Sequence, residues 1–349
     1  MSNTLESERA AKNLAARIGY KARLLKWPEG APRHYNLWQM AKESGKQFGI
    51  KIGEMVRQSR SFSPFALPQF EYTRFLNTLE LEKGDEYKGL KTGFALLDRA
   101  LGGVHGLNVI GGAPKVGKST FLIQIASEMA LKKIPILYYD FENGRQRIYQ
   151  RTVSRLAQIA TDDFASPALG GEQQQRFNDA CESLQKMLFH WRVVNDRSIN
   201  PELMRKHIDF IRHETKSEYT VVVVDSLHKL PFKDFSERRT GIDAWLRQME
   251  SIRDEMQVSF MVISELSREA TGSYREEPHM GVFKGSGDIE YSADNAMVLY
   301  PDMDSQIRDG RDDRSNTLWL VASRENSPGK VASYSLDFPF WGFIEKQIG

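Results

Sequence analysis

The chain has 349 residues, of which 40% are hydrophobic and 27% are charged, and its formal net charge is only +2. This composition excludes a disordered polyelectrolyte, a collagen-like repeat and a disulfide scaffold, and the length suits roughly two domains of ~100–200 residues. The single cysteine, Cys181, cannot form an internal disulfide, which favours a reducing compartment. No apolar run approaches the ~20 residues that span a bilayer, and the N-terminus lacks the apolar core of a signal peptide. We therefore expect a cytoplasmic protein.

Residues 1–60 are predicted to form a small basic α/β unit. They hold 12 Lys or Arg and five Asp or Glu, a net of +7, which leaves −5 for the rest of the chain. Such a segment suits either a nucleic-acid contact or a solvated helical face. A helix is expected over 8–18, a short strand over 20–25 and a second helix over 38–48.

Residues 61–88 are predicted to be a linker that contains one amphipathic helix. Apolar or aromatic side chains at 72, 75, 76 and 79 recur at helical spacing within 69–81. We expect the apolar face of this helix to dock on an adjacent subunit if the protein assembles.

Residues 89–349 alternate strands with helices, which indicates an α/β domain with a mostly parallel central sheet. Strands are expected at 107–111, 134–139, 188–194, 220–224, 259–264, 296–300, 317–322 and 332–337. Helices are expected at 117–131, 144–160, 171–187, 201–215 and 240–256.

The strongest motif is GAPKVGKST, which matches GxxxxGK[ST] between an apolar strand and a helix. The backbone amides of such a loop and the N-terminus of the following helix bind phosphate oxygens. Lys118 is expected to reach the β- and γ-phosphates, and the hydroxyl of Ser119 to bind Mg²⁺. The candidate nucleotide ligands are Gly112, Ala113, Pro114, Lys115, Val116, Gly117, Lys118, Ser119 and Thr120.

Acidic residues follow two other predicted strands. Asp225 ends a run of four valines and is expected to hold the metal through water. Asp140 and Glu142 follow the strand over 134–139, at the carboxyl edge where open α/β sheets place their ligands. One of them is needed to orient or activate the attacking water, and spacing alone does not choose between the two.

In this order, the motifs resemble the RecA-like ATPase domain of the hexameric replicative helicases of DnaB type, and the helicase half of phage and mitochondrial primase-helicases. The resemblance covers residues 88–340 and implies a RecA-like P-loop NTPase core. The segment 92–103 resembles the family motif before the phosphate-binding loop. The segment 136–142 resembles the strand that ends in the catalytic glutamate of the family, which favours Glu142 over Asp140.

Two positions depart from the family pattern. Within 262–268, Glu265 stands where the family has a glutamine that senses the γ-phosphate. A carboxylate near a triphosphate is repelled unless it is protonated or faces a cation, so we expect Glu265 to contact metal or a basic neighbour. Within 322–329, Arg324 takes the place of the arginine that reaches the neighbouring subunit's nucleotide, and Ala322 replaces a lysine. An ordinary surface arginine is the alternative for Arg324.

The resemblance also bears on DNA and on the N-terminal unit. Lys284, Gly285, Ser286 and Gly287 resemble part of a loop that faces DNA in the hexamer channel, although any flexible loop has this composition. Residues 10–48 resemble the tail of a primase-type TOPRIM domain. The metal-binding acids of that domain would lie before or at residues 1–5, where this chain has Met-Ser-Asn-Thr-Leu, so we interpret the segment as a degenerate or truncated remnant without primase chemistry.

The sequence thus predicts a Mg²⁺-dependent ATPase that assembles into a ring, expected to be a hexamer, and couples ATP hydrolysis to movement on single-stranded DNA among other replication proteins. The predicted catalytic residues are Lys118, Glu142, Asp225, Glu265 and Arg324, with Ser119 and Asp225 at the metal. A RecA- or RadA-like or regulatory DNA-binding ATPase without unwinding activity is one alternative. A binding module that ATP switches is the other.

Overall fold

The computed structural model describes residues 3–63, 68–70, 72–73, 75–76, 89–165, 169–231, 238–267, 277–283, 288–302 and 315–348. The chain divides into two compact units, Met1–Gly84 and Asp85–Gly349, and each is described by itself. Among the described helices, none combines the length and the apolar character needed to cross a membrane.

Within residues 3–63, the first unit contains three α-helices, a 3-10 turn and a short antiparallel strand pair. Its elements are α1 (Leu5–Ile18), β1 (Arg23–Leu24), α2 (Leu37–Ser44), the 3-10 turn η1 (Gly45–Gln47), α3 (Phe48–Gln58) and β2 (Arg60–Ser61). Asn36 starts α2 with a capping box, in which its side chain accepts from the amide of Gln39 and the Gln39 side chain accepts in return. The predicted helix over 38–48 is wrong in extent, because α2 ends at Ser44 and α3 is a separate helix.

The predicted linker helix over 69–81 falls partly on described residues. Positions 69–70, 72–73 and 75–76 are helical, and the remaining positions lie outside the described residues. The side chains of Phe70, Tyr72, Phe75 and Leu76 are exposed.

The second unit is built on one sheet, in which the described strands follow the order β11-β10-β9-β8-β3-β7-β6-β4-β5. Neighbours from β8 to β5 pair in parallel, and β8, β9, β10 and β11 pair antiparallel in turn. The strands are β3 (Leu107–Gly112), β4 (Ile136–Asp140), β5 (Trp191–Val194), β6 (Val221–Asp225), β7 (Ser259–Ile263), β8 (Asn295–Pro301), β9 (Ser315–Ser323), β10 (Gly329–Asp337) and β11 (Gly342–Lys346). The predicted α/β fold with a mostly parallel sheet is confirmed.

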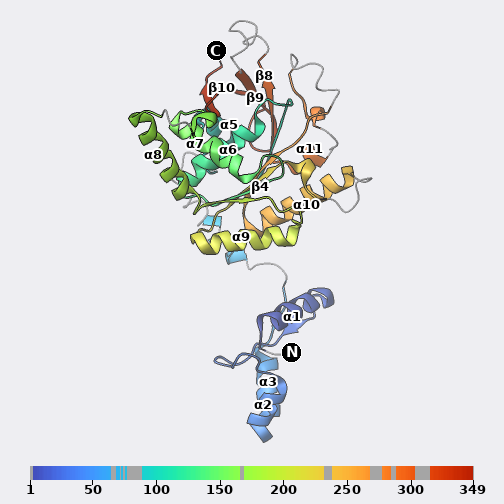
Figure 1. Cartoon of the computed structure of the whole chain (residues 1–349). Coiled ribbons are helices and arrows are strands. Elements are labelled where there is room, and N and C mark those ends of the chain that lie inside the picture. Colours follow the sequence, from blue (N-terminus) through green and yellow to red (C-terminus); the bar gives the residue numbers. More distant parts are fainter. Residues whose placement is uncertain are drawn as a thin grey trace. The chain divides into compact units, whose positions relative to one another are not determined.

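Helices cover both faces of this sheet. The α-helices are α5 (Ala95–Leu101), α6 (Lys118–Leu131), α7 (Arg145–Ala157), α8 (Gly171–Met187), α9 (Pro201–Thr215), α10 (Arg238–Met256) and α11 (Asp288–Ser292), and the 3-10 turns are η2 (Thr161–Asp163), η3 (Leu227–Lys229) and η6 (Met280–Val282). One core packs α5, α6 and α7 against one face, and a second core packs α9, α10 and α11 against the other (Figure 1).

The valine run shows why the sequence forms this layered structure. Val221 and Val223 point into the first core, whereas Val222 and Val224 point into the second. Alternate side chains of a strand face opposite sides of a sheet, so a strand covered on both sides needs apolar residues throughout. β6 is such a strand, with all four valines at most 1% exposed.

The structure corrects the strand predictions at two places. The strand predicted over 188–194 begins only at Trp191, because α8 runs to Met187 and a turn follows it. β11 is missing from the prediction. Its sequence GFIEK is short and contributes one large buried side chain, Phe343, so its pairing depends on β10 and not on a local pattern.

Candidate nucleotide-binding site

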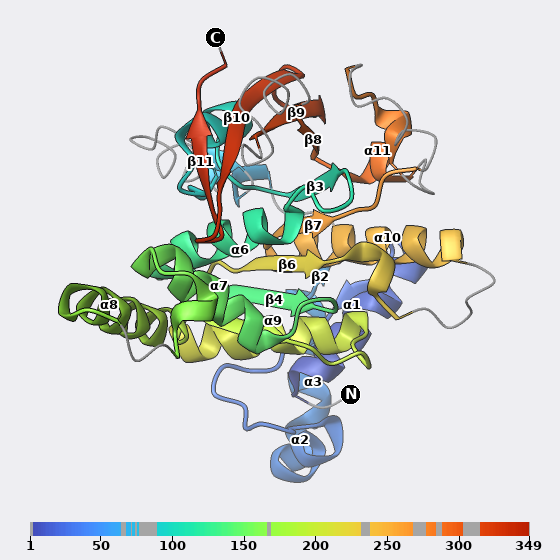
Figure 2. The same cartoon turned by 45° about the horizontal axis from the view of Figure 1, so that its top comes forward.

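A pocket of about 690 Å³ opens at the carboxyl ends of β3, β7, β6 and β4, which lie side by side in the sheet (Figure 2). Ligand sites in proteins commonly have volumes of ~300–1,000 Å³, and open parallel sheets bind ligands at this edge. The lining residues are Gly112, Pro114, Lys115, Gly117, Lys118, Ser119, Thr120, Glu142, Asn143, Arg151, Asp225, Ser226, Ile263, Glu265, Leu266 and Trp341. The segments that follow these four strands therefore each deliver at least one predicted site residue to the same place.

The predicted phosphate-binding loop connects β3 to α6. Gly117 directly precedes the first residue of α6 and has a φ of +98°, a conformation that favours glycine. A Cβ atom at this position would also lie 2.8 Å from the ring of Phe343. The turn therefore requires glycine, and it directs the N-terminus of α6 into the pocket, where an anion is favoured.

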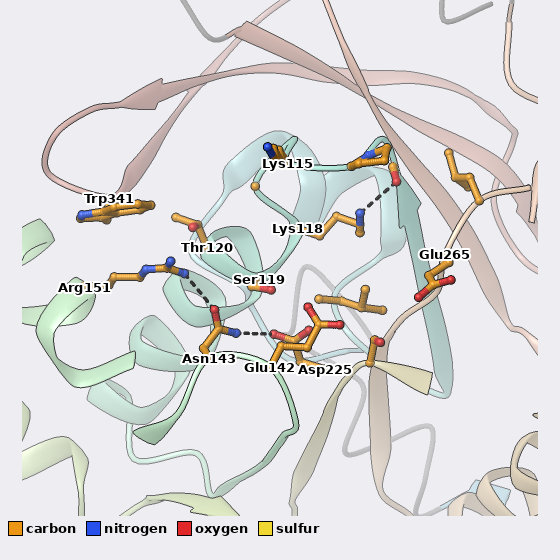
Figure 3. Close-up of a pocket in the computed structure, with 16 residues that line it drawn as sticks. Lys115, Lys118, Ser119, Thr120, Glu142, Asn143, Arg151, Asp225, Glu265 and Trp341 are labelled. Carbon is orange, nitrogen blue, oxygen red and sulfur yellow. Dashed lines mark hydrogen bonds between the residues drawn. The ribbon is translucent and has the colours of Figure 1, made fainter. Parts of the chain in front are cut away.

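Lys118 lies at the centre of the pocket (Figure 3). Its Nζ donates hydrogen bonds to the carbonyl oxygens of Gly112 at 2.9 Å and Ala113 at 3.0 Å. Burial lowers the pKa of Lys118, and the charges of Asp225, Glu142 and Glu265 oppose that shift. Three carboxylates that line the same pocket thus favour the charged form of this ammonium group.

Asp225 ends β6 and is 1% exposed. Burial raises its pKa to about 6, with Glu142 and Asp140 acting in the same direction and the Ser119 hydroxyl opposing. Its Oδ2 accepts hydrogen bonds from the hydroxyl of Tyr138 at 3.1 Å and from Nδ2 of Asn143 at 3.2 Å. Its Oδ1 is buried and accepts none from the described residues.

These oxygens fit a magnesium ion. Mg²⁺ prefers oxygen ligands and keeps several waters, so it needs one or two protein groups beside the phosphates. Asp225 offers a buried acceptor without a donor, and Ser119 lies next to it in the pocket (Figure 3). Within the described ranges, no group of three or more His, Cys, Asp or Glu residues could hold a metal ion.

The structure separates the two acids that follow β4. Asp140 is 1% exposed, and its carboxylate accepts from the amides of Asn143 at 3.0 Å and Gly144 at 2.6 Å, and from Nδ2 of Asn195 at 2.9 Å. It therefore holds the turn together. Glu142 is exposed and lines the pocket, which leaves its carboxylate accessible to a water molecule.

Glu265 follows β7 and reaches the pocket from between β3 and β6. Its backbone amide donates to Nδ1 of His228 at 3.3 Å. Its charge opposes the lowering of the Lys118 pKa, and both side chains line the same pocket.

Arg324 does not line the pocket of its own chain. It follows β9, and its guanidinium pairs with Asp294 and with the carbonyl oxygen of Tyr291. Ala322 pairs with Ala296 in the β8–β9 ladder. The predicted DNA-facing residues 284–287 lie outside the described residues.

Asn143, Arg151 and Trp341 line the pocket without having been predicted. The guanidinium carbon of Arg151 lies 4.3 Å from the ring centroid of Trp341, and its Nη1 donates to Oδ1 of Asn143 at 3.3 Å. In Figure 3 this pair lies on the side of the loop away from Glu265. The sequence does contain a signal for Asn143, because this residue directly follows Glu142 after a predicted strand. No local pattern connects Arg151 with Trp341.

The mostly parallel sheet, the GKS loop and the acids at the ends of neighbouring strands define a RecA-like P-loop nucleotide-binding domain. The family comparison agrees with this class. The chain belongs to the DnaB-like helicase C-terminal domain family, whose model matches residues 89–339.

Individual proteins show the same relationship. The replicative DNA helicase DnaB of Rickettsia felis is 24% identical over 341 residues, which cover 88% of this chain and 68% of that protein. This chain covers only 55–59% of the length of three other curated relatives. One of them is the replicative DNA helicase DnaC of Bacillus subtilis, which is 25% identical.

Two solved structures have the same fold. One is described as a DnaB-like replicative helicase and its interactions with primase; it has a TM-score of 0.72 at 17% identity, and the match covers 98% of this chain and 77% of that one. The other is described as an isolated ATPase domain and has a TM-score of 0.72 at 18% identity. That match covers 81% of this chain and 100% of the ATPase domain.

Proposed function

We propose that this protein hydrolyses ATP and couples the hydrolysis to translocation on single-stranded DNA, as a helicase of the replicative type. The observation that carries the proposal is that Lys118, Ser119, Glu142 and Asp225 lie in one pocket at the end of four adjacent strands. The family membership of residues 89–339 supports the same function.

The pocket residues suit phosphoryl transfer to water. The loop amides and Lys118 would bind the triphosphate, and Ser119 and Asp225 would hold Mg²⁺, which supplies positive charge to the phosphate oxygens when bound. Glu142 would orient the attacking water and accept its proton, because its carboxylate is exposed within the pocket. Glu265 would act through Lys118, the cation that it faces.

Arg324 suggests that each site is shared between subunits. It follows Ser323, the last residue of β9, which lies opposite Asn295 where β9 pairs with β8. Asn295 in turn lies opposite Asn108, near the start of β3, where β8 pairs with β3. The pocket lies at the other end of β3, so this arginine is at the opposite edge of the sheet from its own nucleotide site. We propose that it serves the pocket of a neighbouring subunit in a ring, with a hexamer as the expected size.

The partners follow from the same assignment. We propose single-stranded DNA as the track, with 284–287 among its contacts, and a primase as a replication partner, because a structural neighbour is described with primase. Such a protein would act in the cytoplasm on replicating DNA.

Phosphate release measured with and without a single-stranded oligonucleotide tests the proposal. The wild-type protein should turn over ATP faster with the oligonucleotide, and Lys118→Ala should abolish turnover in both conditions. A forked duplex distinguishes a helicase from an ATPase that does not unwind. Wild-type turnover in Lys118→Ala would remove the assignment of the pocket.

A further inference from the structure

Arg324 is held in a defined position by its own subunit. Its Nη1 lies 3.2 Å from Oδ1 of Asp294, and its Nη2 donates to the carbonyl oxygen of Tyr291 at 2.7 Å. Its backbone amide also donates to the carbonyl oxygen of Asp294 at 2.9 Å. The side chain nevertheless remains 49% exposed. A guanidinium has five N–H donors, so these contacts orient the group and leave donors for another partner.

Asp294 is itself firmly anchored. Its Oδ2 accepts from the backbone amide of Leu107 at 2.7 Å and pairs with Nη1 of Arg253 at 2.7 Å. Gly106 makes this approach possible, since a Cβ atom there would lie 2.1 Å from that oxygen, and its φ is +62°. The Asp294 side chain is only 15% exposed. One carboxylate oxygen is thus fixed to the start of β3, and the other faces Arg324.

The backbone around Arg324 is restrained in the same way. The hydroxyl of Ser323 accepts from the amide of Asn326 at 2.9 Å and donates to Oδ1 of Asn295 at 2.7 Å. Asn295 donates in turn to Oδ1 of Asn108 at 2.8 Å. The residues next to Arg324 are therefore connected to β3 and β8 through buried side chains.

We propose that Asp294 is the positioning residue of Arg324, which fixes the guanidinium in the direction required by the nucleotide of the neighbouring subunit. This inference rests on the proposed shared site. An arginine that stabilises phosphoryl transfer in trans is worth ~10³–10⁵ in rate, and a misplacement of ~1 Å can remove ~10² of such an effect. Asp294 therefore acts on catalysis through Arg324 and touches no substrate.

A subunit-mixing experiment tests this role. Asp294→Asn keeps the shape of the side chain and removes its charge. We expect its DNA-stimulated kcat to fall at least about tenfold, with the Kd of an ATP analogue within about twofold of wild type. Co-assembly with Lys118→Ala subunits should restore turnover, because the Lys118→Ala subunit supplies an Arg324 that is still held by Asp294. If Asp294 instead acted on the pocket of its own subunit, or only on folding, the Lys118→Ala subunits would not restore turnover.

One further mixture makes the outcomes distinct. Arg324→Ala mixed with Lys118→Ala should also recover turnover, and failure of this mixture would contradict the shared site itself. Recovery with Arg324→Ala but not with Asp294→Asn would overturn only the role of Asp294, as would a wild-type kcat in Asp294→Asn alone.

Asp254→Asn is the matched control. Asp254 pairs with Arg253 at 2.7 Å, as Asp294 does, and the charge of Arg324 contributes to lowering its pKa, but the ion pair of Asp254 is with Arg253 and not with Arg324. Its turnover should stay within about twofold of wild type, and a loss equal to that of Asp294→Asn would overturn the proposal. If Asp294→Asn fails to fold, Asp294→Ser, which also removes the charge that faces Arg324, takes its place in the mixtures.

Discussion

The side-chain amide of Asn143 donates to Oδ2 of Asp225 across 3.2 Å, and thereby connects the turn after β4 to the candidate metal-binding acid at the end of β6. The same amide donates to Oδ1 of Asp140 at 3.1 Å, and Oδ1 of Asn143 accepts from Nη1 of Arg151. One uncharged residue therefore joins two carboxylates and a guanidinium.

Replacing Asn143 should impair hydrolysis through Asp225. In Asn143→Ala, Oδ2 of Asp225 loses a donor, and Arg151 loses its contact with the turn. Groups that orient metal ligands typically contribute ~10–100-fold to affinity or activity, so we expect kcat/KM to fall by about that factor. Asn195→Ala is the control, because Asn195 donates to the carboxylate and the carbonyl oxygen of Asp140 in the same turn. Equal losses in both variants would show that the turn matters and the Asp225 contact does not.

The raised pKa of Asp225 predicts how stability depends on pH. Burial, above all, raises this pKa from 3.8 to about 6, so the folded state binds the proton more tightly than the unfolded state. The buried, ionised carboxylate of Asp225 therefore lowers the free energy of unfolding. This loss of stability is absent below about pH 4 and fully present above about pH 6. Without Mg²⁺ and nucleotide, Asp225→Asn should therefore be more stable than wild type at pH 7.5, by up to about 3 kcal/mol.

Thermal unfolding at pH 4.5 and 7.5 checks this sign. The advantage of Asp225→Asn should shrink at the lower pH, where the wild-type carboxyl is protonated in the folded state. Asp254 has its pKa lowered by a hydrogen bond from Arg253, so Asp254→Asn should give no stabilisation at pH 7.5. A pH-independent advantage for Asp225→Asn would contradict the assignment.

Glu265→Gln should strengthen ATP binding. It removes a negative charge from a pocket that would hold a triphosphate, and one unit charge near a protein surface is worth about 1 kcal/mol or more, a factor of about five. We expect the Kd for ATP to fall several-fold in titration calorimetry. Glu290→Gln removes an exposed charge from α11 and should change little. Weaker binding by Glu265→Gln would instead indicate that the carboxylate contacts the metal.

Trp341→Leu should weaken nucleotide binding. The Trp341 ring lies 4.3 Å from the guanidinium carbon of Arg151, and both side chains line the pocket. A cation–π or stacking contact between this pair and the bound nucleotide would be worth about 0.5–2 kcal/mol, so we expect the Kd for ATP to rise between about twofold and thirtyfold when the ring is removed. Trp319→Leu removes a ring covered by Lys330 that does not line the pocket, and it is the matched control. An unchanged Kd in Trp341→Leu would exclude a role for this pair in binding.

Much of the fold is predictable because its signals are local. The apolar run Val221–Val224 indicates a buried strand, and helical spacing identifies α6, α8 and α9 close to their observed bounds. The GKS loop is also local, since strand, turn and helix are consecutive in the chain. The short strand β11 and the break between α2 and α3 escape prediction, because tertiary pairing and one glycine turn decide them.

For the candidate site, the sequence by itself determined which residue types stand at the ends of which strands: Lys118, Glu142, Asp225 and Glu265. The order of β3, β7, β6 and β4 in the sheet brings them to one pocket, and only the tertiary structure decides that order. Only the tertiary structure shows that Asp140 is enclosed by donors while Glu142 stays accessible. The contacts of Asn143 with Asp225, of Arg151 with Trp341 and of Arg324 with Asp294 likewise depend on it. Propensity and periodicity act over a few residues, whereas these contacts join segments that packing alone brings together.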